Sequence, residues 1–462
     1  MDAITAWMEK AILPIATKIG NQKHLVALRD AFISTLPVTM AGSVAVLLNA
    51  FIRDFPSDFG WDAFVDFMQP LISVNGFVWT GSLAIMAIVF SVTLGANIAK
   101  AYHVDPLPGS IVSLAAFVMG LTQSASLSQP IAYDALTPDA LSVISEAGMT
   151  VSEVVDGSIT LGMEGWGFFN FAAHMGGPGL FTALIFGMIS TIIFSKLMLK
   201  NLTIKLPEQV PPAVSKAFSA IIPATLALYV VGLINYLFTE FVGTPVITWI
   251  SETIQTPLMQ LSQGFGAILI LVFLVHLLWF FGLHGTNILG PVFQTLYGAA
   301  MTDNINAFQA GNPIPWDWVA GSFESFVWPG GAGVTLVFVI SLVLLSKRAE
   351  SKTIGKLALA PGIFNINEPV MFGAPIVLNP VYIIPFIVAP LVTTTIAYFA
   401  TVLGLVNPVV VNVLWVMPAG ISGFLATGGD WRAVILTIVN LLAAFAIWAP
   451  FVLMANRIKD DA

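Results

Sequence analysis

Residues 361–390 read PGIFNINEPVMFGAPIVLNPVYIIPFIVAP and decide the fold. The stretch holds six prolines and one charged residue, Glu368, and it lies among long apolar runs. Each interior proline removes a helical hydrogen bond and clashes with the preceding turn, so no unbroken helix crosses a membrane here. Broken backbone at membrane depth is tolerated only where protein buries it or where it lines a wet cavity. We therefore expect this stretch to form a transporter's substrate site, with Glu368 buried within it.

The composition is that of a polytopic membrane protein. The chain is 57% hydrophobic and only 9% charged, with a mean hydropathy of +0.90, whereas soluble domains are roughly 25% charged. It contains no cysteine, which excludes disulfides, thiolate metal sites and cysteine catalysis. No group of histidines and acids has metal-ligand spacing, and no basic stripe suggests nucleic-acid binding, so we expect neither a metal nor a cofactor.

The apolar runs predict an all-α protein with about ten transmembrane helices. Two further uncharged stretches, around Ile363–Leu378 (apart from Glu368) and Val409–Leu425, are cut by Pro and Gly and are interpreted as re-entrant hairpins. The weakest candidate is Leu283–Met301, which is interrupted by glycine. The ten predicted spans are Ala31–Ile52, Trp79–Ala99, Leu107–Gln123, Phe168–Ser195, Ala217–Thr239, Gly264–Gly282, Leu283–Met301, Val327–Ser346, Val381–Leu405 and Ala433–Met454.

The distribution of charge supports this topology. Fifteen of the 17 Lys and Arg residues fall in clusters that alternate with acidic segments such as residues 54–66 and 134–164. By the positive-inside rule, both termini are cytoplasmic in a bacterial cell membrane. Residues 4–19 have apolar positions at helical spacing, which favours an amphipathic helix on the membrane surface over an ordinary solvent-facing helix.

A division into two domains is suggested at residues 205–216, where KLPEQVPPAVSK concentrates proline and charge. Residues 1–210 would form a scaffold of about five transmembrane helices. Residues 211–462 would form the substrate-binding domain, since every broken helix lies there. The segment Thr244–Gln263 has the pattern of an amphipathic connector within that second half.

Two titratable residues in the second half are the main site candidates. Glu368 could accept two hydroxyl hydrogen bonds and act as a general base, or it could cap broken backbone or pair with His284. His284 follows aromatics and glycines at a helix end, where it could contact a sugar hydroxyl or simply bond a backbone carbonyl. Asn365 and Asn367 could cap backbone groups or contribute to the site.

Aromatic and amide side chains extend the list of candidates. Trp279 and Trp415 lie near helix breaks and could cover the apolar face of a sugar, although membrane tryptophans commonly belong to the interfacial belt. Asn170 is an uncharged polar residue within a Phe-rich run. Asn287, three residues after His284, completes the predicted substrate-binding set.

The motif resembles that of a known family. Asn-Ile-Asn-Glu-Pro-Val at 365–370 and Phe-Gly-Ala-Pro-Ile-Val-Leu-Asn-Pro at 372–380 are similar to the signature of the membrane (EIIC) subunits of bacterial phosphotransferase-system (PTS) sugar transporters, in the lactose/cellobiose/N,N'-diacetylchitobiose branch. Phe281-Gly282-Leu283-His284-Gly285 matches a second motif of these subunits. The resemblance implies a glucose-superfamily fold that dimerises through its N-terminal half and moves sugar by an elevator-like motion of its C-terminal half.

The resemblance also implies roles for individual residues. Glu368 and His284 would contact a disaccharide in a pocket lined by Trp279, Trp415 and Asn170. Phosphorylation would come from a soluble EIIB subunit that carries phosphocysteine, and EIIB must be a separate chain because this one has no cysteine. The basic segment Lys347–Lys356 would either dock EIIB or be a plain positive-inside loop.

The sequence thus predicts a dimeric PTS permease subunit for a β-linked disaccharide of the cellobiose or N,N'-diacetylchitobiose type. It would present the sugar's 6-hydroxyl for phosphorylation, with Glu368 as the candidate base. The alternative is a proton-coupled sugar symporter that uses Glu368 and His284 as a relay. A passive channel or a sugar-sensing membrane protein is a third interpretation.

Overall fold

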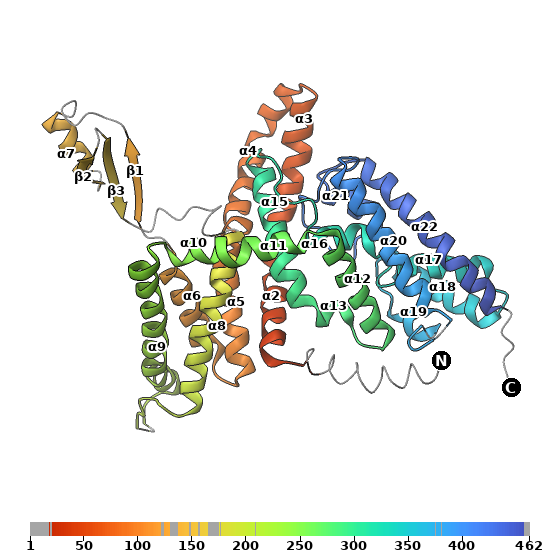
Figure 1. Cartoon of the computed structure of the whole chain (residues 1–462), viewed down its shortest axis with the longest axis horizontal. Coiled ribbons are helices and arrows are strands. Elements are labelled where there is room, and N and C mark those ends of the chain that lie inside the picture. Colours follow the sequence, from red (N-terminus) through yellow and green to blue (C-terminus); the bar gives the residue numbers. More distant parts are fainter. Residues whose placement is uncertain are drawn as a thin grey trace.

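The computed structural model describes residues 18, 21–121, 124–129, 137–146, 149–155, 158–164, 175, 177–207, 209–374, 376–379 and 381–456. Figure 1 shows two helical bundles side by side, joined by a nearly horizontal helical segment, with a small sheet at the outer end of the N-terminal bundle. The predicted surface helix at residues 4–19 lies outside the described residues, apart from Lys18.

The N-terminal bundle is organised around α5, which packs against α2, α6 and α8. Small residues allow these helices to approach closely. A Cβ atom added to Gly95 of α5 would lie 2.5 Å from the carbonyl oxygen of Gly109 in α6. The long helices of this bundle are α2 (Lys23–Asn49), α4 (Asp62–Thr80), α5 (Met86–Ala101), α6 (Pro106–Met119), α8 (Gly177–Leu199) and α9 (Pro212–Leu237).

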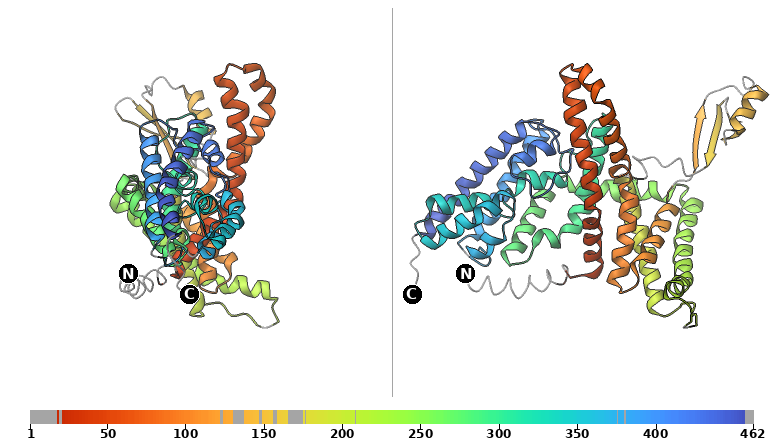
Figure 2. Two further views of the ribbon diagram at one scale, coloured as in Figure 1. Left: turned by 90° about the vertical axis from the view of Figure 1, so that its right-hand side faces the viewer. Right: turned by 180° about the vertical axis from the view of Figure 1, so that it is seen from behind.

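Helices α2 and α4 form a long hairpin that the charge pattern did not predict. Helix α2 continues through η1 (Ala50–Asp54) into α3 (Phe55–Asp58), and a continuous apolar helix runs from Lys23 to Ser57, 35 residues in all. At 1.5 Å per residue this is roughly 50 Å, longer than the bilayer's hydrocarbon core. The hairpin accordingly rises beyond the rest of the bundle in both views of Figure 2. Residues 62–66, expected in an acidic loop, are the start of α4.

A three-stranded antiparallel sheet replaces the loop expected at residues 124–164. Its order is β1–β3–β2, formed by Ser124–Gln129, Met149–Val155 and Ser158–Glu164, with α7 (Pro138–Glu146) between β1 and β2. The all-α prediction is therefore wrong for this segment. Only two residues, Asp-Gly, separate β2 from β3 in the sequence, which is a hairpin signal that an analysis of charge alone overlooks.

The predicted connector between the bundles is confirmed. It consists of α10 (Val246–Ile250), η7 (Ser251–Gln255) and α11 (Thr256–Ser262), and the chain then bends by 75° into α12 (Phe265–Phe280). Buried Val246, Ile247 and Ile250 form its apolar face.

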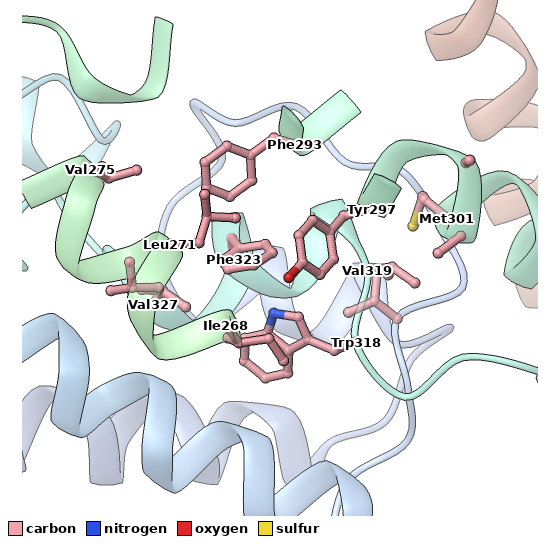
Figure 3. Close-up of a cluster of buried hydrophobic side chains, with 14 of the residues drawn as sticks. Ile268, Leu271, Val275, Phe293, Tyr297, Met301, Trp318, Val319, Phe323 and Val327 are labelled. Atoms are coloured by element: carbon pink, nitrogen blue, oxygen red, sulfur yellow. The ribbon is translucent and has the colours of Figure 1, made fainter. Parts of the chain in front are cut away.

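The C-terminal bundle contains every helix break between α12 and α22. Its aromatic core is drawn in Figure 3: the ring of Phe323 packs edge-on against Phe293 and Tyr297, with centroids 4.8 and 4.9 Å apart, and Trp318 is fully buried beside it. The remaining elements are α13 (Gly285–Ile288), α14 (Gly290–Val292), η8 (Phe293–Gly298), α15 (Ala299–Gln309), α16 (Ala320–Ser322), η9 (Phe323–Val327), α17 (Thr335–Leu345), α18 (Ala349–Ile363), α19 (Glu368–Gly373), α20 (Ile383–Val402), α21 (Ile421–Ala426) and α22 (Arg432–Ala455).

Among the described residues, six helices are long and apolar enough to span a membrane, or seven if the bent pair that ends in α12 is one span. Two predicted spans are short apolar helices, α6 and α17. The span expected at Leu283–Met301 is wrong as a single helix, because the glycines that weakened it divide it into α13, α14, η8 and the start of α15. Ten crossings therefore remain a prediction.

The close contact between α5 and α6 predicts opposite effects for two glycine substitutions. Gly95→Ala should lower the melting temperature of the purified protein, because the new methyl group would overlap the α6 backbone at a cost of about 1–3 kcal/mol. Gly76→Ala in α4 is the control, since a Cβ there meets nothing within 4 Å and should be neutral or slightly stabilising. Equal melting temperatures for the two variants would contradict this packing.

Candidate functional site

The end of α12 places His284 through two glycines. Gly282 has a φ of 75°, the left-handed conformation that glycine adopts without strain, and it ends the helix in a tight turn. Gly285 then lies against the α12 backbone, where an added Cβ would be only 2.1 Å from the carbonyl oxygen of Val275. Any larger residue at position 285 would push His284 away from the helix.

The hydrogen bonds of His284 define which ring nitrogen is available. Its Nδ1 accepts the backbone N–H of Asn287 at 3.3 Å and lies 3.0 Å from the hydroxyl of Thr286. A nitrogen that accepts an N–H carries no proton, so in the neutral ring the proton is on Nε2. The half-buried imidazole therefore offers one N–H donor to a ligand.

Trp279 and Glu368 both lie near this imidazole. The rings of Trp279 and His284 have centroids 4.3 Å apart. The carboxylate of Glu368 is close enough to interact electrostatically with His284, and so is the guanidinium of Arg29 from α2. Trp279 is 4% exposed, so its ring is buried behind the His284 imidazole. The structure thus brings together three of the residues predicted to form the site.

A backbone hydrogen bond joins the two broken segments that carry these residues. The N–H of Leu378, after α19, donates to the carbonyl of Phe280 at the end of α12, with an N···O distance of 2.9 Å. Val377 also contacts Gly282, where an added Cβ would be 3.3 Å from its Cγ1 atom. The turn after α12 and the segment after α19 are therefore fixed to each other.

Asn365 ties three loops together. It has a left-handed backbone, with φ of 61°, and its side chain is buried. Its Oδ1 accepts the N–H of Gly330 at 2.7 Å, and its Nδ2 donates to the carbonyls of Trp415 and Met417 at 2.6 and 3.0 Å. One amide thereby satisfies three backbone groups from two distant loops. Of the two roles left open for Asn365, the structure favours the capping role.

Asn367 is also directed into the fold. It is 4% exposed, and its Nδ2 donates to the carbonyl of Ala332 at 3.4 Å. An added Cβ at Gly331 would lie 2.7 Å from the Asn367 side chain. Its predicted role in substrate binding remains a prediction, because the contacts it makes here are with the loop at 330–333.

Glu368 is exposed in this structure, so the prediction of a buried acid is wrong. Glu368 is the first residue of α19, and Pro369 after it is exposed as well. Behind them, Val370 and Met371 are buried and anchor the short helix. The sequence analysis expected the whole motif to be buried, whereas only one face of α19 is.

The remaining predicted residues lie apart from this group or outside the described chain. Trp415 is 54% exposed and is linked to the motif through its carbonyl bond with Asn365. Asn287 is exposed, and its backbone N–H donates to Nδ1 of His284, which caps α13. Asn170 lies outside the described residues.

Two contributors were not identified from the sequence. One is the loop Pro329–Gly333, in which Gly330, Gly331 and Gly333 all have φ between 84° and 95° and which receives both asparagines of the motif. Three glycines in four residues were the available signal. The other is Arg29, which charge counting assigned only to the positive-inside pattern.

An apolar groove elsewhere does not have the chemistry of a sugar site. It encloses about 440 Å³ against α6 and α9 and is lined by Met119, Leu228, Gly232 and Leu233, with Tyr229 and Tyr236 at its edge. Sugar binding needs several convergent donors and acceptors, which the group around His284 offers and this groove does not.

Comparison with known proteins identifies the family. The family model described as "Phosphotransferase system, EIIC" matches residues 29–390. The chain belongs to the phosphotransferase-system EIIC family. This EIIC chain is 41% identical to the "PTS system cellobiose-specific EIIC component" of Lactococcus lactis subsp. lactis, over 100% of this chain and 99% of that protein. It is 34% identical to the "PTS system oligo-beta-mannoside-specific EIIC component" of Bacillus subtilis, over 86% and 81% of the two chains.

The fold of the EIIC chain is also similar to a solved structure. The crystal structure of the IIC component from the N,N'-diacetylchitobiose-specific phosphotransferase system matches it with a TM-score of 0.85 and 33% identity, over 98% of both chains. The family resemblance read from residues 365–380 is therefore confirmed.

The role of Asn365 leads to a prediction about stability. Asn365→Ala should cost a few kcal/mol, because it leaves the buried N–H of Gly330 without this partner at about 1–3 kcal/mol and also removes the partner of two part-buried carbonyls, besides the strain of a left-handed alanine. Asn201→Ala is the matched control: Asn201 is also left-handed, with φ of 54°, but exposed, so it measures the backbone strain alone. Thermal unfolding of both variants provides the comparison, and equal losses would contradict the tie between the loops.

Proposed function

We propose that this EIIC chain carries a β-linked disaccharide of the cellobiose or N,N'-diacetylchitobiose type across the cell membrane and presents it for phosphorylation. The proposal on substrate is supported by the relatives, which are named for cellobiose, oligo-β-mannoside, lichenan and N,N'-diacetylchitobiose. The single observation that carries the site is that the segment bearing Trp279 and His284, whose rings lie 4.3 Å apart, is hydrogen-bonded through Phe280 to the segment that follows Glu368.

The three side chains provide complementary contacts for a sugar. The Nε2–H of His284 donates to a hydroxyl or ring oxygen, while the carboxylate of Glu368 accepts hydroxyl protons. The ring of Trp279 backs His284, and the exposed Trp415 offers a second aromatic surface for the apolar face of the sugar. Charge-assisted bonds of this kind are about twice as strong as neutral ones, which makes Glu368 the main determinant of affinity.

Phosphoryl transfer then follows from positioning. The 6-hydroxyl loses its proton to Glu368 as its oxygen bonds to phosphorus, and the phosphorus–sulfur bond to the EIIB cysteine breaks, so that the cysteine leaves as a thiolate. The exposure of Glu368 supports this step, since a separate protein must bring its phosphoryl group to the sugar. Holding the reacting oxygen and phosphorus about 3–3.5 Å apart is the main contribution of the site.

The arrangement of helices supports different roles for the two bundles. The N-terminal bundle, which ends with α9 (Pro212–Leu237) and so extends past the boundary predicted at residue 210, would be the scaffold of a homodimer within the lipid bilayer. The bundle after the connector, from α12 onward, would carry the sugar in an elevator-like motion relative to it. The clusters of Lys and Arg support a cytoplasmic position for both termini, and phosphorylation by EIIB requires that the open side of Glu368 be reached from the same side.

Replacing the acid tests the binding role. Glu368→Gln keeps the size of the side chain but removes its charge, so cellobiose affinity measured by calorimetry should fall about 10- to 100-fold, the loss of one or two hydrogen bonds to a charged group. Glu252→Gln, at an exposed acid of the connector, is the control and should bind like the wild type. Unchanged affinity in Glu368→Gln would refute the role.

Transport into membrane vesicles separates this function from a proton-coupled symporter, for which Glu368 and His284 would form the relay. We expect phosphorylated sugar inside the vesicles, and only when phosphorylated EIIB is present on the cytoplasmic side. Free sugar accumulated in response to a proton gradient would establish the symporter instead, and equilibration without accumulation would indicate a channel or a sensor.

A further inference from the structure

Helix α18 forms the surface beside Glu368, and hydrogen bonds to the end of α22 hold it in place. At its start, the N–H of Lys347 donates to Oδ1 of Asn456 at 2.8 Å, while Nδ2 of Asn456 donates to the carbonyl of Leu345 at 3.0 Å. Asn456 follows the last turn of α22, so the start of α18 is bound to the C-terminal end of that helix. Figure 1 accordingly shows α18 and α19 at the end of the bundle where α22 finishes.

One face of α18 is buried and the opposite face is free. Gly355 packs on α17, where an added Cβ would lie 3.0 Å from Val343, and Ile354 contacts Gly373 of α19 in the same way at 3.2 Å. Because α18 also packs against α19, this free face borders the helix that begins with Glu368.

The free face combines basic and apolar side chains. Lys352 and Lys356 are exposed one turn apart, and Leu357 beside them is 72% exposed. Toward Glu368, Phe364 is 49% exposed and Phe372 is 61% exposed. Residues 347–366 contain four basic residues, Lys347, Arg348, Lys352 and Lys356, and one acidic residue, Glu350. Exposed aromatic and apolar side chains beside charged ones are common in protein interfaces.

We propose that this face of α18, with Phe364 and Phe372, is the docking surface for the phosphorylated EIIB subunit. The inference rests on the proposed function, which requires EIIB to deliver a phosphoryl group to a sugar held at Glu368. That group carries close to two negative charges at neutral pH, and the exposed Lys352 and Lys356 would attract it as EIIB approaches. The segment Lys347–Lys356, whose role the sequence left open, thereby becomes part of an interface.

A protein partner fits this surface better than lipid does. The alternative occupant is the membrane itself, since basic and apolar side chains also bind anionic lipid surfaces. However, the surface continues to the exposed carboxylate of Glu368, and a carboxylate in hydrocarbon costs about 2.5–3.5 kcal/mol. A surface that ends at a solvated acid suits a soluble protein that approaches from the water phase.

The test measures the initial rate of cellobiose phosphorylation against the concentration of phosphorylated EIIB, with the full EIIC chain in neutral detergent. The double variant Lys352→Glu and Lys356→Glu should raise the half-saturating EIIB concentration at least 10-fold, while cellobiose affinity without EIIB stays within twofold of the wild type. The matched control, Lys200→Glu and Lys205→Glu, makes the same charge change at exposed lysines of the N-terminal bundle and should leave both values unchanged.

Two further measurements make the result decisive. Leu357→Gln should raise the half-saturating EIIB concentration several-fold without reversing any charge, and added salt should weaken EIIB binding more in the wild type than in the double variant. An unchanged EIIB dependence in the double variant overturns the proposal. So does a defect that occurs only in vesicles of anionic lipid, which would assign the face to the membrane. If the wild type binds cellobiose but phosphorylated EIIB never phosphorylates it, the proposed function itself fails.

Discussion

Wherever a helix breaks within a membrane protein, the backbone groups it exposes must find partners inside the protein, and the amide of Asn365 meets this requirement for three groups at once. It holds the segment between α18 and α19 to the glycine loop at 330–333 and to the backbone of Trp415 and Met417. Through the bond from Leu378 to Phe280, this network also reaches the turn that carries His284. The geometry of the site therefore depends on hydrogen bonds to backbone groups rather than on contacts among the site residues themselves.

The same network explains why Glu368 is exposed while its support is buried. Val370 and Met371 anchor α19 in the core, and Asn365 and Asn367 fasten the loop before it, so Glu368 is held rigidly on an open face. A helix of six residues has little stability of its own and takes its position from such anchors. A carboxylate arranged in this way can receive both a sugar and a second protein.

Helix α2 links the two bundles near both of its ends. Near its start, the side chain of Arg29 approaches Gly290, where an added Cβ would be 3.5 Å from its Cγ atom, and it acts electrostatically on His284. Beyond its other end, the ring of Phe55 in α3 covers Gly429, at the turn before α22, so closely that a side chain there would overlap it. The elevator-like motion proposed for the C-terminal bundle would have to exchange both contacts.

The sequence was most informative where local chemistry decides structure. Proline spacing correctly indicated the breaks on either side of α19, although α18 and α20 continue through Pro361, Pro385 and Pro390. The apolar periodicity of Thr244–Gln263 predicted the connector, and the pairing of Trp279 with His284 followed the motif. The exposure of Glu368 could not be predicted, because it depends on how α18 and α19 pack at the end of the bundle. The length of the α2 and α4 hairpin was missed because the acidic residues at its end were interpreted as a loop between two membrane spans. The sheet was missed because residues 124–164 were judged by their charge and not by the strand pattern of their side chains.

The most direct test of the account is an experimental structure of the protein with cellobiose bound. The account predicts that a sugar hydroxyl lies within hydrogen-bond distance of the Glu368 carboxylate and that another sugar oxygen accepts from Nε2 of His284, while Asn365 keeps its bonds to Gly330 and Trp415. A sugar bound elsewhere, or a Glu368 side chain that faces lipid with no sugar beside it, would contradict the account.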